Sequence, residues 1–163
     1  MAKIIYVDPS KCTGCRTCEL VCSIKNEGMA NPALSRIQVI AYKNQGVRVP
    51  MTCQQCEDSI CSSVCPVGAL RRDNKMGVVK HNKKKCIGCK LCVSTCPFGG
   101  INFNVKSREI FKCEQCDGSP QCIRFCEDKA ITYIEADAVA AKKRRQTAQN
   151  LSPILESTSS RKG

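Results

Sequence analysis

The sequence is short of the residues that build an ordinary hydrophobic core. Its 163 residues include no tryptophan and a single histidine, and aromatic residues make up only 4%. Leu, Ile, Val and Phe together supply about 21% of the chain, close to the level at which chains fail to bury a core. A chain this poor in large apolar side chains needs disulfides or metal to hold a fold.

Long apolar runs are lacking as well. The first twelve residues contain only four consecutive apolar or aromatic residues, IIYV, too few for the core of a signal peptide. No run approaches the roughly 18 apolar residues of a membrane-spanning helix. We therefore expect a soluble, cytoplasmic protein without membrane insertion, unless it is exported together with a partner. In the cytoplasm thiols stay reduced, and grouped cysteines usually bind metal.

Cysteine is abundant instead, with 16 residues in four motifs and none outside them. Motifs one and three have the C-x2-C-x2-C-x3-C spacing of bacterial iron–sulfur sites, and motifs two and four lengthen one gap. The pattern predicts four [4Fe-4S] clusters. In chain order the motifs are Cys12, Cys15, Cys18 and Cys22; Cys53, Cys56, Cys61 and Cys65; Cys86, Cys89, Cys92 and Cys96; Cys113, Cys116, Cys122 and Cys126.

Each motif is expected to serve two clusters. Its first three cysteines lie on a tight loop around one cluster, where backbone amides point at the sulfurs and Gly14 and Gly88 permit close approach. We expect the fourth cysteine to open a short helix that leads away from this loop. It then binds the cluster of another motif, so that two motifs exchange their fourth ligands.

The spacers indicate which motifs exchange. Between motifs two and three, residues 69–72 and 78–81 are strand-like and flank the turn sequence DNKMG, which predicts a hairpin. A two-cluster ferredoxin has such a hairpin between its motifs, so motif two is expected to pair with motif three, and motif one with motif four. The strand pairs expected from this nesting are 3–7 with 130–136, 36–42 with 108–112, and 46–50 with 101–105.

Nesting predicts an α+β fold of two interleaved 2[4Fe-4S] ferredoxin units with pseudo-twofold symmetry. The outer unit comprises residues 1–45 and 106–135, the inner unit residues 46–105, and residues 136–163 form a C-terminal helix and extended tail. The expected ligand sets are Cys12, Cys15, Cys18 and Cys126 (cluster a); Cys113, Cys116, Cys122 and Cys22 (cluster b); Cys53, Cys56, Cys61 and Cys96 (cluster c); Cys86, Cys89, Cys92 and Cys65 (cluster d).

Zinc sites and disulfides explain the cysteine pattern less well than iron–sulfur clusters do. A zinc ribbon uses two C-x-x-C pairs and leaves the third and fourth cysteines of each motif unexplained. A disulfide framework requires an oxidising compartment. The formal net charge of +12 would suit nucleic acid, but four oxidised clusters would lower it to about +4, so much of the basic excess balances buried anions. A zinc-stabilised nucleic-acid module is therefore a remote alternative.

Three segments carry a resemblance to a known family: VPMTCQQCEDSICSSVCPVGAL, GVVKHNKKKCIGCKLCVSTCPFGGI and FKCEQCDGSPQCIRFCEDKAI. They resemble the four-cluster, ferredoxin-like electron-transfer subunits of molybdenum and tungsten pterin oxidoreductases, over about residues 3–135. That family also uses nested pairing. The short form is most similar to the small subunits of tungsten aldehyde oxidoreductase-type enzymes, including the ATP-independent benzoyl-coenzyme A reductase of anaerobes.

The resemblance implies two protein partners: a large catalytic pterin-binding subunit and a further electron donor or acceptor. One departure from the family concerns the residue after the fourth cysteine, which is usually proline. Pro66 and Pro97 keep it, whereas Ser23 and Glu127 replace it, which predicts wetter or differently hydrogen-bonded surroundings for the outer clusters.

No residue set in the sequence supports catalysis on a substrate, since no nucleophile with a base and no phosphate loop is recognisable. The predicted function is single-electron transfer between the catalytic subunit and a redox partner. A free-standing polyferredoxin and a formate dehydrogenase- or hydrogenase-associated subunit are the alternatives. His81 is expected to be a solvated hairpin residue, and Lys83, Lys84 and Lys85 either dock an acidic partner or are merely solvated.

The last part of the sequence changes character. Residues 135–150 have helix-forming composition, with acidic residues early and basic residues late, which suits the helix dipole. Residues 151–163 lose this pattern. They are expected either to fray or to form an arm on a partner subunit, with Leu151, Ile154 and Leu155 as the contacts.

Overall fold

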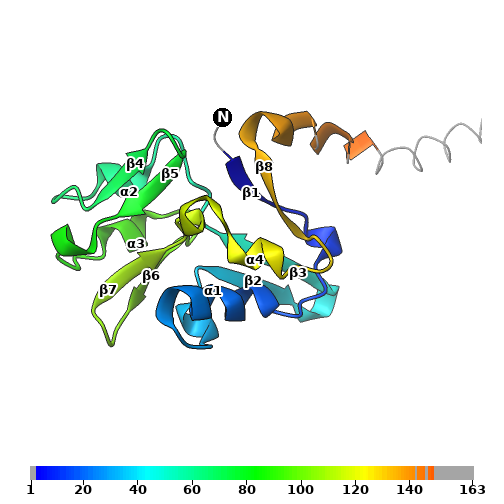
Figure 1. Ribbon diagram of the computed structural model, residues 1–163, viewed down its shortest axis with the longest axis horizontal. Helices are drawn as coiled ribbons and strands as arrows, with labels where there is room; N and C mark the ends of the chain where they lie inside the picture. Colours follow the sequence, from blue (N-terminus) through cyan, green and yellow to red (C-terminus); the bar gives the residue numbers. More distant parts are fainter. Residues whose placement is uncertain (1–2, 142, 146, 149–163) are drawn as a thin grey trace, which may run out of the picture.

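The chain forms two lobes of short strands and helices (Figure 1). The computed structural model describes residues 3–141, 143–145 and 147–148. The outer lobe contains β1 (Lys3–Val7), α1 (Thr17–Glu27), β2 (Ile37–Tyr42), β3 (Val47–Thr52), α4 (Gln121–Arg124) and β8 (Ile131–Glu135). The inner lobe contains α2 (Ile60–Ser63), β4 (Leu70–Asp73), β5 (Val78–His81), α3 (Leu91–Thr95), β6 (Ile101–Asn104) and β7 (Glu109–Lys112).

Two of the predicted strand pairs are confirmed. β1 pairs antiparallel with β8, so the first strand of the chain lies beside the last strand before the C-terminal helix, with Tyr6 opposite Thr132. β4 and β5 form the predicted hairpin between motifs two and three, with Leu70 opposite His81. The first pair closes the outer lobe over a separation of more than a hundred residues, as nesting requires.

The other two predicted pairs are wrong. β2 pairs with β3, and β6 pairs with β7, so both pairs are local hairpins within one lobe. Their turns contain residues with positive φ, Gly46 at +66° and Arg108 at +56°, which suit tight connections. Closing a short loop costs less conformational entropy than joining distant segments, so local pairing is favoured wherever turn chemistry permits it.

The position of the helices also differs from the prediction. The fourth cysteine does not open a helix. In α2, α3 and α4 the helix carries the third cysteine and ends before the fourth. Pro66 and Pro97 follow two of these fourth cysteines directly, and the residue before a proline disfavours the helical conformation. In α1 Ser23 stands at this position, and the helix continues past Cys22 to Glu27.

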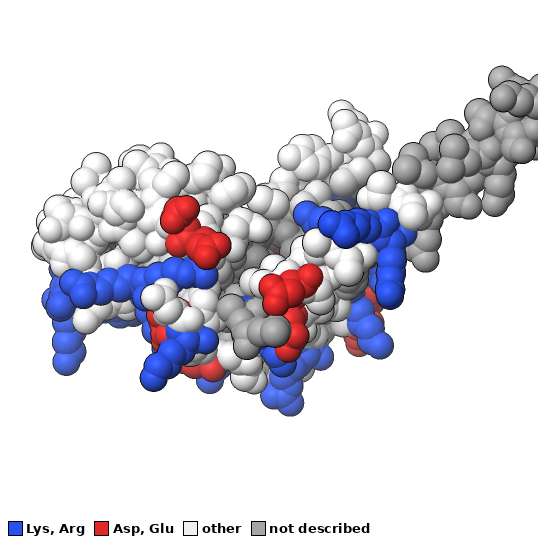
Figure 2. Space-filling model, turned by 90° about the horizontal axis from the view of Figure 1, so that it is seen from above, with Lys and Arg blue, Asp and Glu red and all other residues white. Residues whose placement is uncertain are grey.

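The surface is divided in charge. Figure 2 shows Lys and Arg side chains gathered along one side of the face seen there, while much of the opposite side carries no charged side chain.

A helix follows β8 and includes residues 136–141 and 143–145, close to the predicted start of the C-terminal helix. Within the described residues, no helix is both long and apolar enough to cross a bilayer. The expected arm contacts Leu151, Ile154 and Leu155 lie outside the described residues.

Candidate functional site

The cysteines gather around cavities, and each of three cavities contains cysteines from two motifs. One is lined by Cys12, Cys15 and Cys18 of motif one together with Cys126 of motif four. α1 and α4 pack against each other and bring these motifs together. The set is the one predicted for cluster a.

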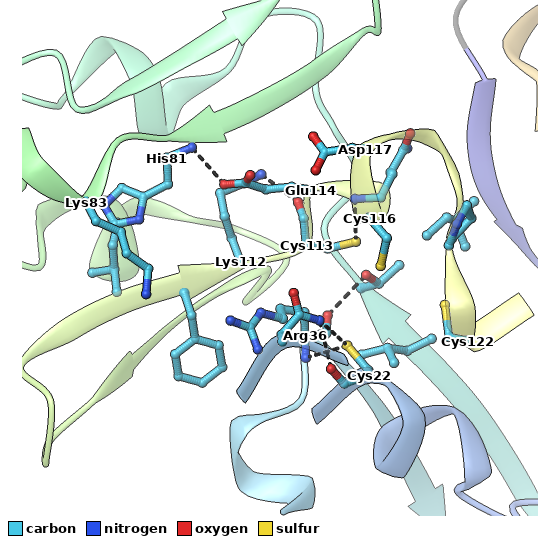
Figure 3. A pocket seen from close by; sticks show the side chains of 18 residues that line it. Cys22, Arg36, His81, Lys83, Lys112, Cys113, Glu114, Cys116, Asp117 and Cys122 are labelled. Carbon is cyan, nitrogen blue, oxygen red and sulfur yellow. Dashed lines mark hydrogen bonds between the residues drawn. The ribbon is translucent and has the colours of Figure 1, made fainter. Parts of the chain in front are cut away.

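A second and larger cavity of about 300 Å³ lies where the lobes meet. Figure 3 shows the sulfurs of Cys22, Cys113, Cys116 and Cys122 arranged around one side of it. Three of these cysteines belong to motif four, and Cys22 comes from α1. This is the set predicted for cluster b, and the rest of the cavity wall is rich in charged side chains.

The inner lobe repeats the arrangement. A cavity with an entirely apolar lining apart from its cysteines and Lys90 holds Cys86, Cys89 and Cys92 together with Cys65 of motif two. For the remaining set, burial raises the pKa of Cys61, and the charges of Cys53 and Cys96 raise it further. Cys56 is half-buried in the same loop.

Backbone amides point at several sulfurs, but mostly at those of fourth cysteines, whereas the prediction placed them in the loop of the first three. The N–H groups of Arg36, Ala69 and Gly100 donate to the sulfurs of Cys22, Cys65 and Cys96 at 3.2–3.3 Å. The sulfur of Cys113 accepts from the N–H of Gln115 at 3.4 Å. At Cys65 burial by itself would raise the pKa, but the surrounding backbone amides outweigh burial and lower it. Such amides stabilise a thiolate, the form that binds iron.

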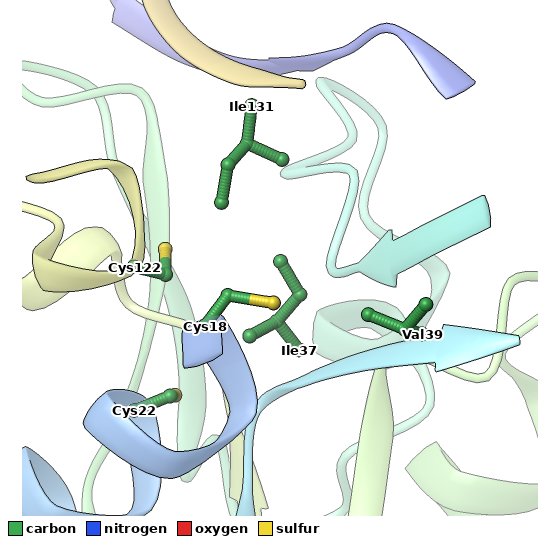
Figure 4. Close-up of a cluster of buried hydrophobic side chains, with 6 residues drawn as sticks. All are labelled: Cys18, Cys22, Ile37, Val39, Cys122 and Ile131. Carbon is green, nitrogen blue, oxygen red and sulfur yellow. The ribbon is translucent and has the colours of Figure 1, made fainter. Parts of the chain in front are cut away.

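The third cysteine of three motifs is buried in the core. Burial raises the pKa of Cys18 to about 12 and that of Cys92 to about 11, and it raises the pKa of Cys122 further still. Figure 4 shows Cys18, Cys22 and Cys122 packed with Ile37, Val39 and Ile131. The sulfur sites thus form part of the hydrophobic core, which accounts for the scarcity of large apolar residues.

The donor set fits iron–sulfur clusters. All sixteen cysteines are free thiols, so none is committed to a disulfide. A buried thiolate is costly unless a cation compensates it, and bound metal deprotonates a thiol outright. Within the described residues, no three His, Cys, Asp or Glu side chains converge on a point suited to one metal ion. A [4Fe-4S] cluster has no such requirement, since its four thiolates bind four different iron atoms.

Several residues at the site were missed by sequence reasoning. Gln55 and Gln115 stand directly before the second cysteine of motifs two and four, both with positive φ and both buried. Lys112 is buried at the junction of the lobes, and an added Cβ on Gly100 would lie 2.8 Å from Cα of Cys53. The repeated Gln-Cys pair was a visible signal, whereas the burial of Lys112 had none, because lysines also precede exposed motifs.

Other predicted features differ in detail. His81 lies on β5, but its Nε2 is buried without a hydrogen-bond partner in the described part of the chain, and burial lowers its pKa. The expectation of a solvated side chain is therefore wrong.

Ser23 is fully buried, donates to the carbonyl of Leu20 and accepts from the N–H of Asn31. The wetter or differently hydrogen-bonded surroundings expected for the outer clusters stay a prediction. Gly14 and Gly88 have positive φ, and a Cβ added there would meet the side chain of Arg48 or the carbonyl oxygen of Arg108.

Fold and cysteine sites together define a ferredoxin-type iron–sulfur protein. A family profile described as a 4Fe-4S dicluster domain matches residues 45–133, and one described as a 4Fe-4S binding domain matches residues 5–23. The chain belongs to the 4Fe-4S dicluster domain family. Together with the sixteen cysteines, these matches identify its cofactors as four [4Fe-4S] clusters.

Relatives agree with an electron-transfer role. The chain is 40% identical to the polyferredoxin-like subunit of an aliphatic sulfonate oxidoreductase from Pyrococcus furiosus, over 76% of this chain and 71% of the relative. It is 35% identical to the electron transport protein HydN of Escherichia coli K12, over 91% and 98%. A solved structure, the BamBC complex of benzoyl-coenzyme A reductase with 1,5-dienoyl-CoA, matches 81% of this chain and 75% of that chain at 26% identity and a TM-score of 0.48. The protein is an electron-transfer iron–sulfur subunit of an oxidoreductase.

Proposed function

We propose that the four clusters are held by exchanged ligands, with the assignment predicted from the sequence. The supporting observation is that three cavities each combine three cysteines of one motif with the fourth cysteine of its partner motif. The same exchange defines two interleaved units with pseudo-twofold symmetry. In view of the observed hairpins, we assign β3 to the outer unit and β7 to the inner unit.

The four ligand sets follow one another in a row, in the order a, b, c, d. Sets a and b adjoin where α1 packs against α4, and sets c and d adjoin where α2 packs against α3. Sets b and c adjoin where Nε2 of Gln55 in motif two donates to the carbonyl oxygen of Cys113 in motif four at 2.7 Å. When bound, the clusters supply one-electron redox chemistry. The chain holds them in sequence and lines the site of set d with apolar side chains.

The two ends of this row reach the surface. Cys15 and Cys89 are the exposed members of the sixteen cysteines, and they belong to the first and the last set. Their rims differ. Around Cys89 lie the exposed apolar side chains of Ile87 and Leu91. At the other end, the hydroxyl of Thr13 donates to Asp128 at 2.8 Å across motifs one and four. Two chemically different ends suit two different partners.

The finer proposal concerns these partners. One is a large catalytic subunit that binds a tungsten or molybdenum pterin, of the aldehyde oxidoreductase type, and the other is an electron donor or acceptor protein in the cytoplasm. The sequence resemblance supports this proposal, as does the description of the Pyrococcus furiosus relative as a subunit of an oxidoreductase. A free-standing carrier is the second candidate, favoured by the description of HydN as an electron transport protein.

Paired cysteine variants test the exchange. In the anaerobically purified protein, with about sixteen iron atoms, the double variant Cys61→Ala with Cys96→Ala removes two ligands of one cluster. We expect Mössbauer and EPR spectra with one cubane perturbed. The matched variant Cys92→Ala with Cys96→Ala should perturb two. The reverse pattern would show that Cys96 binds the cluster of its own motif, and a colourless zinc protein would refute the iron–sulfur function itself.

Affinity purification of the tagged protein from its native cells tests the partner. We expect a large subunit in a stoichiometric amount, containing tungsten or molybdenum and a pterin. The variant Ile87→Asp places a charge in the apolar rim beside Cys89 and should weaken recovery of the protein that docks there, whereas Val105→Asp, at an exposed turn, should not. Recovery of the protein alone, fully loaded with iron, would favour the free-standing carrier.

A further inference from the structure

Lys112 is a buried cation whose hydrogen bonds are satisfied but whose charge is not compensated by an acid. Its side chain is 4% exposed. Its Nζ donates to the carbonyl oxygens of Val79 and, at 2.7 Å, Cys113. Within the described residues no carboxylate forms an ion pair with it. The carboxylate of the adjacent Glu114 accepts instead from the N–H of His81 at 2.8 Å. A buried charge without a counter-charge is costly.

The place of Lys112 in the fold is the junction between the lobes. It is the last residue of β7 in the inner lobe, directly before Cys113, which begins motif four. The side chain of Gln55 hydrogen-bonds to the backbone of the same two residues, Val79 and Cys113. Its Nε2 donates to the carbonyl of Cys113 at 2.7 Å, and its Oε1 accepts from the N–H of Val79 at 3.0 Å. Figure 3 shows Lys112 beside Cys113 and Glu114 in the wall of the large cavity.

Two ligand sets lie within reach of this charge, and they are the two central sets of the row. Lys112 directly precedes Cys113, and its Nζ donates to the carbonyl oxygen of Cys113 at 2.7 Å. The same carbonyl oxygen accepts from Nε2 of Gln55 at 2.7 Å, and Gln55 directly precedes Cys56 of motif two. Cys113 belongs to set b and Cys56 to set c. A [4Fe-4S] cluster held by four thiolates is anionic.

Lys112 differs in burial from the lysines at the equivalent positions of the other motifs. The residue before the first cysteine of each motif is Lys11, Thr52, Lys85 or Lys112. The side chain of Lys11 is 54% exposed, and Lys85 is exposed as well. Water and salt screen those two charges, whereas a charge in the interior acts at low effective dielectric. Among these lysines, Lys112 alone has an environment in which its charge acts strongly on a cluster.

We propose that Lys112 is the shared counter-charge of clusters b and c and raises the reduction potentials of both. The inference rests on the proposed ligand sets. Each reduction adds one electron and one negative charge, and a fixed cation nearby stabilises the reduced form more than the oxidised form. Lys112 acts by its charge. As a result, the two central clusters of the row have higher reduction potentials than they would have without the cation.

Redox titration monitored by EPR tests the proposal on the iron-loaded protein. Lys112→Met should lower two of four potentials, each by about a tenfold change in the redox equilibrium constant, which is 59 mV for one electron. Ligand variants such as Cys61→Ala and Cys122→Ala assign the signals. Lys112→Arg keeps the charge and should restore most of the shift. Lys85→Met, at the equivalent exposed position, should change no potential by a comparable amount.

A second control separates charge from structure. Gln55→Leu breaks the same contacts to Val79 and Cys113 without removing charge, so it should leave both potentials near their original values. Equal shifts in Gln55→Leu and Lys112→Met would overturn the proposal, as would unchanged potentials in a fully loaded Lys112→Met. If that variant does not accumulate, Lys112→Gln removes the same charge and takes its place: unchanged potentials of the two central clusters in fully loaded Lys112→Gln contradict the proposal. A protein without four clusters would instead refute the proposed function.

Discussion

Single residues set the approach of the backbone to the sulfur sites. Gly100 donates its N–H to the sulfur of Cys96, and its Cα faces the backbone of Cys53. Both cysteines belong to the proposed set c, although they lie in different motifs. The sequence indicated close approach at Gly14 and Gly88 by their place inside C-x-G-C. It could not indicate Gly100, because the segment that Gly100 meets is almost fifty residues away.

Gly100→Ala should therefore disturb one cluster. The new Cβ would lie 2.8 Å from Cα and 3.2 Å from Cβ of Cys53, so the loop must shift. We expect a loss of about 1–3 kcal/mol of stability and release of iron from one cluster. Gly46→Ala is the matched control, since its φ of +66° is strained but nothing lies within 4 Å. It should cost about 1 kcal/mol with all iron retained. Full iron content in Gly100→Ala would contradict the prediction.

At the scale of elements, each lobe has its own small core built around cysteines. Ile131 of β8 packs with Cys18, Cys22 and Cys122 in the outer lobe. Leu70 of β4 packs with Cys92 in the inner lobe. The strand-like runs were all visible in the sequence, and so was the β4–β5 hairpin. The partners of β2 and β6 were not, because a strand-like run does not show whether it pairs across its own turn or with a distant strand.

Core substitutions should loosen the lobes separately. Ile131→Ala and Leu70→Ala each remove a side chain at most 2% exposed, and each should cost about 2–5 kcal/mol. Iron release to a chelator should quicken for two of the four clusters, the outer two in Ile131→Ala and the inner two in Leu70→Ala. Val105→Ala, at a residue 79% exposed, is the control and should change stability by no more than about 0.5 kcal/mol. Faster release of all four clusters from one variant would show that the lobes unfold together.

The whole molecule binds metal through buried cysteines that must first lose their protons. The pKa values of these thiols, about 12 for Cys18 and about 11 for Cys92 and Cys113, lie above the ordinary value of 9.0 because burial disfavours the thiolate. Below pH 9.0 these thiols are protonated whenever no iron is bound. Iron must displace each proton, so its apparent affinity falls as the pH falls. The net charge of +12 fits the same picture, since it offsets anionic clusters.

Removal of iron should unfold the protein. We expect chelation under reducing conditions to abolish far-UV circular dichroism and to expose the chain to protease, since each lobe's core consists partly of cluster ligands. Reconstitution with iron and sulfide should become more complete from about pH 6.5 to about pH 8.5, because thiols with an ordinary pKa of 9.0 lose their protons to iron more readily as the pH rises. A folded, protease-resistant apoprotein would contradict the prediction, and so would reconstitution that is independent of pH.

The sequence by itself determined the chemistry of this protein. Sixteen cysteines in four spaced motifs specify four clusters, because ligand spacing is a local property that no tertiary contact needs to establish. The pairing of the outermost strands followed from the same order of motifs. Only the tertiary structure decided which lysine is buried and which glycine lies against another motif. These features depend on contacts between segments far apart in the chain, such as Lys112 with Val79 and Gly100 with Cys53, and no local pattern records them.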